Sequence, residues 1–208
     1  MINGSGGLGG TLKFNANPEF KKGEILKFEQ AISTVNNAST GLVYRRSSGQ
    51  FVSSTHFTAQ YGSNEFSFQN PTGQEVVKQR MLGAENQVLS GQQKFAWKLN
   101  KNGVLKWNSF LQLGERRLPH LTYQKVVAET QKDKTLLSNL NYSKQFGTTE
   151  IKAVVGFKAS ELQYQNDAIG INDIGSERSV FAQFRVKYWL FQKLKMENAV
   201  LYNHSFAN

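Results

Sequence analysis

The chain has 208 residues, of which 39% are hydrophobic and 19% charged, with a formal net charge of +10. The absence of cysteine excludes disulfides, thiolate nucleophiles and cysteine-ligated zinc, and the absence of any apolar run near 18 residues excludes a helical membrane protein. Lys and Arg are scattered in clusters no longer than a pair, which favours a solvated basic surface over a nucleic-acid groove.

Residues 1–14 are rich in glycine, and Gly4-Ser5-Gly6-Gly7-Leu8-Gly9 matches the G-x-G-x-x-G pattern of a dinucleotide-binding loop. The flanking residues do not fit that function. Too few residues precede Gly4 to form a buried strand, and Thr11–Phe14 alternates polar and apolar residues as another strand would, instead of opening a helix. We therefore expect a structural role for this segment.

The rest of the chain alternates polar and apolar residues with a period of two, which indicates strands, and helical periodicity is hard to find. We expect an all-β fold. Nine strands are predicted at 24–33, 38–46, 51–61, 87–99, 104–114, 135–145, 149–164, 178–191 and 194–206.

Most of these strands have one apolar and one polar face. In 180–191, for example, Val180, Ala182 and Phe184 share one face, and Gln183 and Arg185 lie on the other. A soluble β-sandwich and a membrane β-barrel both produce this alternation, so the pattern alone does not choose between them.

The connections between the predicted strands differ in length. Short turns at 47–50, 100–103, 146–148 and 192–193 alternate with long connections at 62–86, 115–134 and 165–177. In an up-and-down meander this alternation puts every long connection at one end of the sheet, as in outer-membrane barrels. The sequence therefore predicts an antiparallel up-and-down meander that is part of a transmembrane β-barrel, with about nine strands of a larger barrel.

Three segments resemble TonB-dependent outer-membrane receptors. Gly4–Leu12 is similar to the end of the family's plug domain, where Gly9 and Gly10 would form a close backbone turn. Asn64–Asn70 resembles the extracellular segment after the third barrel strand, with Glu65 in place of the usual Asp. Glu115–Pro119 is similar to the acidic-Arg-x-x-Pro entry of an extracellular loop.

The resemblance implies that residues 1–20 are the C-terminal end of a plug domain with its linker, and that residues 21–208 are the N-terminal portion of the barrel. Such a receptor has about 22 strands, so we expect the chain to be a fragment. By resemblance, the intact protein lies in the bacterial outer membrane, in contact with lipid and lipopolysaccharide. It would take up a scarce large solute, such as a ferric siderophore, a cobalamin or a glycan, with energy supplied by the TonB complex through the missing N-terminal part.

Ligand contacts are expected in the extracellular connections, where polar, aromatic and cationic side chains can hold a solute. The candidate residues are Asn64, Phe66, Arg116, Arg117 and His120. The competing interpretation of Arg116 and Arg117 is a loop anchor paired with Glu115. Near the interfaces, the candidates for aromatic girdles are Trp97, Trp107, Tyr188, Trp189 and Tyr202.

No catalytic, cofactor-binding or metal-binding residues are expected. His56, His120 and His204 are far apart in the sequence and lack partners at ligand spacing, and no G-x-S-x-G nucleophile motif occurs. Two alternatives to the receptor stay open: a passive, porin-like or structural outer-membrane barrel, and a soluble extracellular β-sandwich that binds carbohydrate or protein.

Overall fold

The computed structural model describes residues 18–33, 36–64, 66–70, 77–80, 83–100, 102–118, 129–190 and 194–207. These residues form strands, turns and bends and contain no helix. Accordingly, no helix in the described part of the chain is long and apolar enough to cross a membrane.

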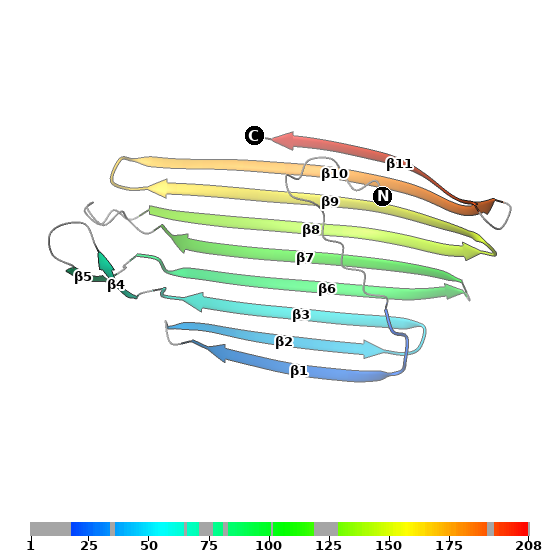
Figure 1. Cartoon of the computed structure of the whole chain (residues 1–208), viewed down its shortest axis with the longest axis horizontal. Helices are drawn as coiled ribbons and strands as arrows, with labels where there is room; N and C mark the ends of the chain where they lie inside the picture. The colour runs from blue at the N-terminus through cyan, green and yellow to red at the C-terminus, as the bar shows by residue number, and fades with distance from the viewer. Residues whose placement is uncertain are drawn as a thin grey trace.

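Nine strands form one antiparallel sheet in which each strand pairs with the next along the chain, apart from one short hairpin insertion (Figure 1). The predicted all-β, up-and-down meander is confirmed. The strands are β1 (Gly23–Ile32), β2 (Asn37–Ser47), β3 (Phe51–Gly62), β6 (Asn86–Asn100), β7 (Gly103–Arg117), β8 (Glu129–Phe146), β9 (Thr149–Asn166), β10 (Ile171–Leu190) and β11 (Leu194–Ala207).

The insertion lies between β3 and β6. Its two strands, β4 (Ser67–Asn70) and β5 (Val77–Arg80), pair only with each other in a separate two-stranded sheet. The sequence pattern predicted a connection without strands over 62–86, because four-residue strands are too short to show a period of two. The hairpin projects from one end of the large sheet (Figure 1).

The predicted long connection at 165–177 is wrong. β9 and β10 continue to pair as far as Asn166 and Ile171, and the chain turns within 167–170, where Gly170 has a φ of 67°. Polar side chains hold this extension together: Gln163 Nε2 donates to Asn172 Oδ1 over 2.8 Å. The strands were missed because both of their faces are polar here, so hydrophobic periodicity disappears although backbone pairing continues.

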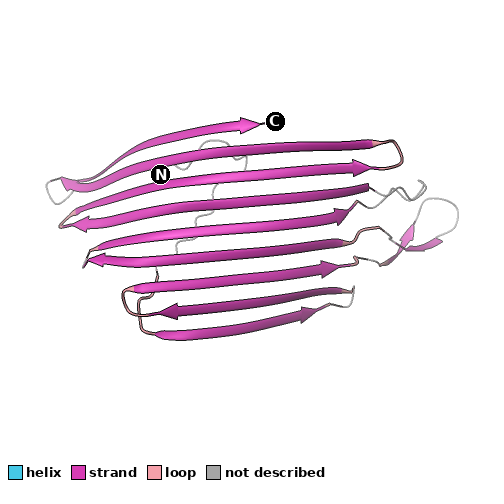
Figure 2. Cartoon of the chain, turned by 180° about the vertical axis from the view of Figure 1, so that it is seen from behind, coloured by secondary structure: helices cyan, strands magenta, loops and turns pink. Residues whose placement is uncertain are grey.

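The connection predicted at 115–134 is also shorter than expected, because β7 reaches Arg117 and β8 begins at Glu129. The strand ends that the two long connections join, β3 with β6 and β7 with β8, do lie at the same end of the sheet, as predicted (Figure 2). The alternation of short and long is not strict, however, since 33–36 and 167–170 are short connections at that same end.

The described residues form a single layer with almost no core. Val52 and Ala96, with 6% and 5% of their surface exposed, are the only hydrophobic residues in the described ranges that are fully buried. Large apolar side chains are exposed instead, including Leu26 at 69% and Val200 at 70%. Exposed apolar area on this scale marks a surface that contacts lipid or another protein.

Candidate functional site

The strand register assigns every side chain of the nine-stranded sheet to one of two faces, because residues directly opposite each other in a ladder point to the same side. We call these the apolar face and the hydrophilic face. The apolar face carries the even-numbered residues of β1, β2, β8, β10 and β11 and the odd-numbered residues of β3, β7, β9 and, up to a bulge at 98–100, β6.

A continuous apolar belt runs along the middle of the apolar face. Its polar members bond to one another: Gln93 Nε2 donates to Ser53 Oγ over 3.0 Å, and Trp107 Nε1 donates to Ser138 Oγ over 2.9 Å. The belt thus meets the requirement that polar groups in an apolar environment be paired. Its large members are Leu26, Phe28, Leu42, Tyr44, Phe57, Leu89, Leu111, Leu113, Leu136, Leu140, Val155, Phe157, Val180, Phe184 and Val200.

Aromatic rings border the belt on the side of the short connections. Phe95 stacks on Phe51 and on Trp107, with ring centroids 5.7 and 5.4 Å apart, and Trp97 lies 5.3 Å from Phe51. Trp97 and Trp107 therefore lie in an aromatic border on the apolar face, whereas the register places Trp189 on the hydrophilic face. The girdle at a membrane interface stays a prediction.

The belt crosses the strands diagonally. On four successive strands its edge is marked by the first charged side chains of the apolar face, which are Glu115 on β7, Lys134 on β8, Glu161 on β9 and Arg178 on β10. From Glu115 the register leads straight across the sheet through Lys132 and Gln163 to Ile174. The edge on β10, at Arg178, therefore lies four residues away from Ile174, the position in register with the edge on β7.

The slope of the belt follows from this displacement. Four residues are about 13 Å along a strand and three strand spacings are about 14 Å, so the edge makes an angle of roughly 40° with the perpendicular to the strands. The opposite edge moves in the same sense. On β1 and β2 this edge is marked by the charged pair Glu24 and Arg46. The residues in register with this pair on β10 and β11 are Ala182 and Tyr202, which lie inside the apolar region.

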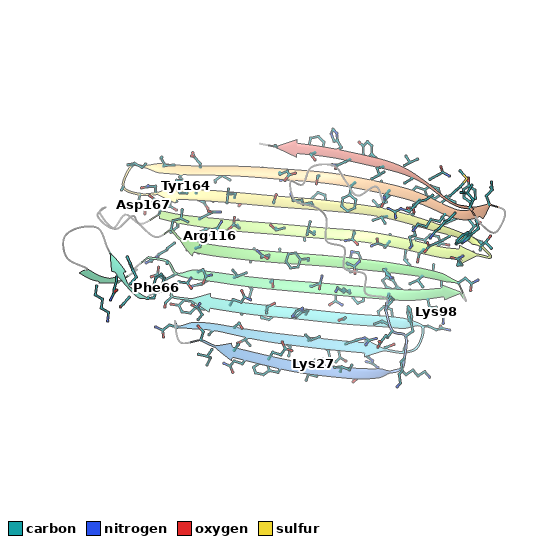
Figure 3. All side chains as sticks on the ribbon, in the orientation of Figure 1. Lys27, Phe66, Lys98, Arg116, Tyr164 and Asp167 are labelled. Atoms are coloured by element: carbon teal, nitrogen blue, oxygen red, sulfur yellow. The ribbon has the colours of Figure 1, made fainter. Side chains whose placement is uncertain are left out.

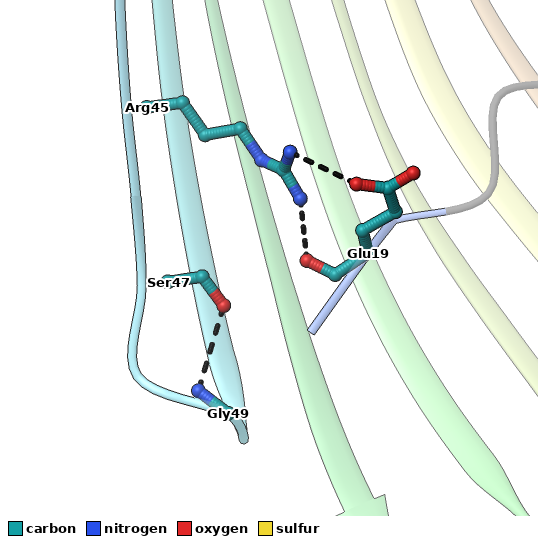
Figure 4. A network of polar contacts seen from close by, with 4 residues as sticks. All are labelled: Glu19, Arg45, Ser47 and Gly49. Carbon is teal, nitrogen blue, oxygen red and sulfur yellow. Dashed lines mark hydrogen bonds and ion pairs between the residues drawn. The ribbon is translucent and has the colours of Figure 1, made fainter. Parts of the chain in front are cut away.

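The hydrophilic face meets the residues that precede β1. Arg45 donates from Nη2 to the carbonyl oxygen of Glu19 and forms an ion pair with its carboxylate at 3.4 Å (Figure 4). Nearby, the hydroxyl of Ser47 accepts a hydrogen bond from the N–H of Gly49 over 3.4 Å. Because Arg45 belongs to the hydrophilic face, Glu19 reaches the sheet from that side.

Two of the predicted ligand-contacting residues lie in the connection that carries the hairpin. Asn64 has a φ of 49°, and its Nδ2 donates to the carbonyl of Ala84 over 2.9 Å. Phe66 is 46% exposed, and its ring centroid is 6.2 Å from that of Phe68. Figure 3 places Phe66 and Arg116 near one end of the sheet and Lys98 near the other.

The predicted arginines point to opposite faces. Arg116 lies on the hydrophilic face, 3.7 Å from Asp133, and Arg117 lies on the apolar face, 3.4 Å from Glu85. The suggested anchor Glu115 pairs instead with Lys132 at 3.8 Å. The two guanidinium groups therefore do not form one clamp on one face of the sheet.

Residues 84 and 85 connect Asn64 to the end of β7. Ala84 accepts the bond from Asn64, and the carbonyl of Glu85 accepts a hydrogen bond from the N–H of Arg117 over 2.8 Å. Asn64 and Arg117 are thus held by adjacent residues, although they are far apart in the sequence. His120, Gly9 and Gly10 lie outside the described residues, so their predicted roles stay predictions.

No protein-family model matches the chain, and a search of curated proteins found no match. Within the residues that the structure describes, no group of three or more His, Cys, Asp or Glu side chains is placed to hold a metal ion.

Proposed function

We propose that the sheet is part of the wall of a transmembrane β-barrel in a bacterial outer membrane, with its apolar face toward lipid and its hydrophilic face toward the lumen. The observation that carries this proposal is the diagonal belt. Strands of membrane barrels tilt by about 35–45°, so a band that is level in the bilayer must cross them obliquely. The belt slopes by roughly 40°.

The height of the belt supports the same proposal. On β7 the belt and its aromatic border together extend from Leu105 to Leu113, which is about 26 Å along the strand and about 20 Å along the membrane normal at that tilt. The apolar band of outer-membrane barrels is about 25 Å tall. Charged residues on one side and stacked aromatic rings on the other match the two interfaces.

The open edges also favour a larger wall. Nine alternating strands leave β1 and β11 running in the same direction (Figure 1). Single-chain bacterial barrels have an even number of antiparallel strands. An odd number of further strands would therefore be needed to close the sheet, so we propose that the described residues supply one portion of a barrel.

We further propose that this barrel belongs to a TonB-dependent receptor that takes up a scarce large solute, such as a ferric siderophore, a cobalamin or a glycan. The resemblance of the glycine-rich segment to the end of a plug supports this. So does the contact between Glu19 and Arg45, because it brings the residues after that segment onto the hydrophilic face, where a plug would lie. The connections 63–85 and 118–128 would supply extracellular ligand contacts.

The absence of cysteine allows a direct test, since each engineered cysteine would be the only one in the chain. Leu111→Cys and Gln112→Cys are adjacent on β7 but point to opposite faces. In outer-membrane vesicles from cells that make the protein, we expect an environment-sensitive fluorophore at position 111 to be quenched by nitroxide lipids. The same fluorophore at position 112 should be quenched only by an aqueous quencher.

The outcome separates the proposed classes. A β-sandwich would cover its apolar face with a second sheet, so neither position would respond to nitroxide lipids. A passive barrel would give the same quenching as a receptor. The two barrels differ in energy coupling, because solute uptake through a TonB-dependent receptor stops when the inner-membrane proton gradient is collapsed, whereas passive diffusion continues.

A further inference from the structure

Most cations of the hydrophilic face have an acidic partner. Lys152 lies 2.6 Å from Glu150, Lys158 lies 2.7 Å from Glu177, and Arg185 lies 3.0 Å from Glu197. Three lysines on β6 and β7 differ. No carboxylate in the described part of the chain pairs with Lys94, Lys98 or Lys106.

The register brings these three lysines onto one patch. Lys106 is directly opposite Ala96, and Ala96 lies between Lys94 and Lys98 on β6. Lys106 is therefore a diagonal neighbour of both, at a separation of about 7–8 Å between backbones, within the reach of long side chains. Lys106 is half-buried, whereas Lys94 and Lys98 are exposed.

On β6, β7 and β8 the patch is flanked by hydrogen-bonding side chains, and the nearest carboxylates of the neighbouring strands and of the residues before β1 are held by other cations, Glu150 by Lys152 and Glu19 by Arg45. Asn108, Asn139 and Asn141 lie beside it on β7 and β8, and Asn108 Nδ2 donates to Asn139 Oδ1 over 3.0 Å. The acidic residues that the register places on the hydrophilic face of β6, β7 and β8 are Glu129 and Asp133, at the far end of β8. Like charges on neighbouring strands repel, and within the described residues no carboxylate forms an ion pair with any of the three lysines.

We propose that Lys94, Lys98 and Lys106 form a binding site for a multivalent oxyanion that carries phosphate or carboxylate groups. Ammonium groups are good point-charge partners for such anions, and each can turn its three donors toward an oxygen atom. One anion placed between the three lysines would replace their mutual repulsion by attraction. The site is inferred from the strand register and from the lack of ion pairs to these lysines among the described residues, so it does not depend on the proposed transport function.

The simplest alternative is that the three lysines are solvated independently. Calorimetric titration of the 208-residue chain in detergent micelles separates the two interpretations, with pyrophosphate and citrate as probes. Tighter binding of pyrophosphate would indicate a phosphate-bearing ligand, and tighter binding of citrate would indicate a carboxylate-bearing one. In either case the affinity should fall steeply with added salt.

Two lysine variants and one control make the test specific. Lys106→Gln should weaken binding about tenfold, since it removes one charge-assisted bond, and Lys98→Gln should do the same if the first variant does not fold. Lys27→Gln is the control, because Lys27 lies on the same face at the edge strand β1, away from the patch.

The control should bind within about twofold of the unmodified protein, as expected for an exposed charge that makes no contact with the ligand. Equal weakening by Lys27→Gln and Lys106→Gln would overturn the proposal, as would the absence of binding by both probes. Neither result would affect the lipid-quenching pattern at positions 111 and 112, so failure of the anion site and failure of the membrane wall remain distinguishable.

Discussion

The ring of Phe181 on β10 lies over Gly156, its direct partner on β9, so closely that a Cβ atom at position 156 would clash with three of the ring atoms. Both residues belong to the hydrophilic face, and Gly156 is buried. An aromatic ring that covers a strand glycine removes that stretch of backbone from water and fixes the register of β9 and β10.

We predict that Gly156→Ala destabilises the sheet by about 1–3 kcal/mol, the usual cost of inserting a methyl group where no space exists. Gly91→Ala is the matched control, because a Cβ atom at this strand glycine would meet nothing within 4 Å. Urea unfolding of the refolded protein gives both values. Equal stability of the two variants would contradict the packing described here.

Asn64 should be needed for its backbone conformation and for its side-chain bond. Asn64→Gly loses only the hydrogen bond to Ala84, which costs about 1 kcal/mol. Asn64→Ala loses the same bond and also keeps a Cβ atom at positive φ without the short polar side chain that makes this conformation tolerable for asparagine, so it should cost about 1–2 kcal/mol more than the glycine variant. We expect limited proteolysis of the connection 63–85 to be slowest in the unmodified protein, faster in Asn64→Gly and fastest in Asn64→Ala. An alanine variant as resistant as the glycine variant would exclude backbone strain.

The indole of Trp107 should depend on Ser138 for its hydrogen-bond partner. Ser138→Ala leaves the Nε1–H unpaired at the belt and is expected to cost about 1 kcal/mol and to shift the tryptophan emission. Ser109→Ala is the control, since Ser109 is directly opposite Ser138 on the same face. Identical spectra and stabilities for the two serine variants would show that the bond contributes nothing.

Acid should weaken the extension of β9 and β10 beyond the belt. Lys158 Nζ donates a hydrogen bond to Glu177 over 2.7 Å, and this bond, together with the lysine charge, holds the pKa of Glu177 below its ordinary value. The stabilisation is therefore complete above about pH 4.3, the ordinary pKa of glutamate, and disappears as the pH falls through the lower folded-state pKa.

The variant Glu177→Gln isolates this effect. The difference in unfolding free energy between the unmodified protein and the variant should be constant from neutral pH down to about pH 5 and should shrink at lower pH. Ser160 Oγ lies beside the same carboxylate and adds to the shift. A difference that stays constant down to pH 2 would show that Glu177 titrates normally.

The strands that cross the belt were predictable because apolar and polar residues alternate along them. Predicted strands such as 104–114 and 149–164 begin within two residues of β7 and β9. The outer parts of β8, β9 and β10 were not predictable. Residues such as Gln163 and Asn172 are polar on both faces, so only their backbone pairing and side-chain bonds keep the strands extended.

The candidate site was predictable only in part. The polar nature of Arg116, Arg117 and Asn64 was evident from the sequence. Because β7 continues to Arg117, however, the two arginines point to opposite faces of the sheet. The prediction of a loop at these residues could not show this. The lysine patch could not be predicted, because Lys106 becomes a neighbour of Lys94 and Lys98 only through the register of β6 and β7. The slope of the belt likewise depends on pairing across several strands.

The depth of the belt edge in the bilayer tests the central claim most directly. Leu113→Cys on β7, Val180→Cys on β10 and Ser176→Cys on β10 would each carry a fluorophore in outer-membrane vesicles, and nitroxides at different lipid depths would locate each label. The register leads from Leu113 straight across to Ser176. With strands tilted by about 40°, positions 113 and 180 should lie at equal depth, and position 176 about 10 Å nearer the surface. Equal depths for positions 113 and 176, or no quenching by lipid at positions 113 and 180, would contradict the account.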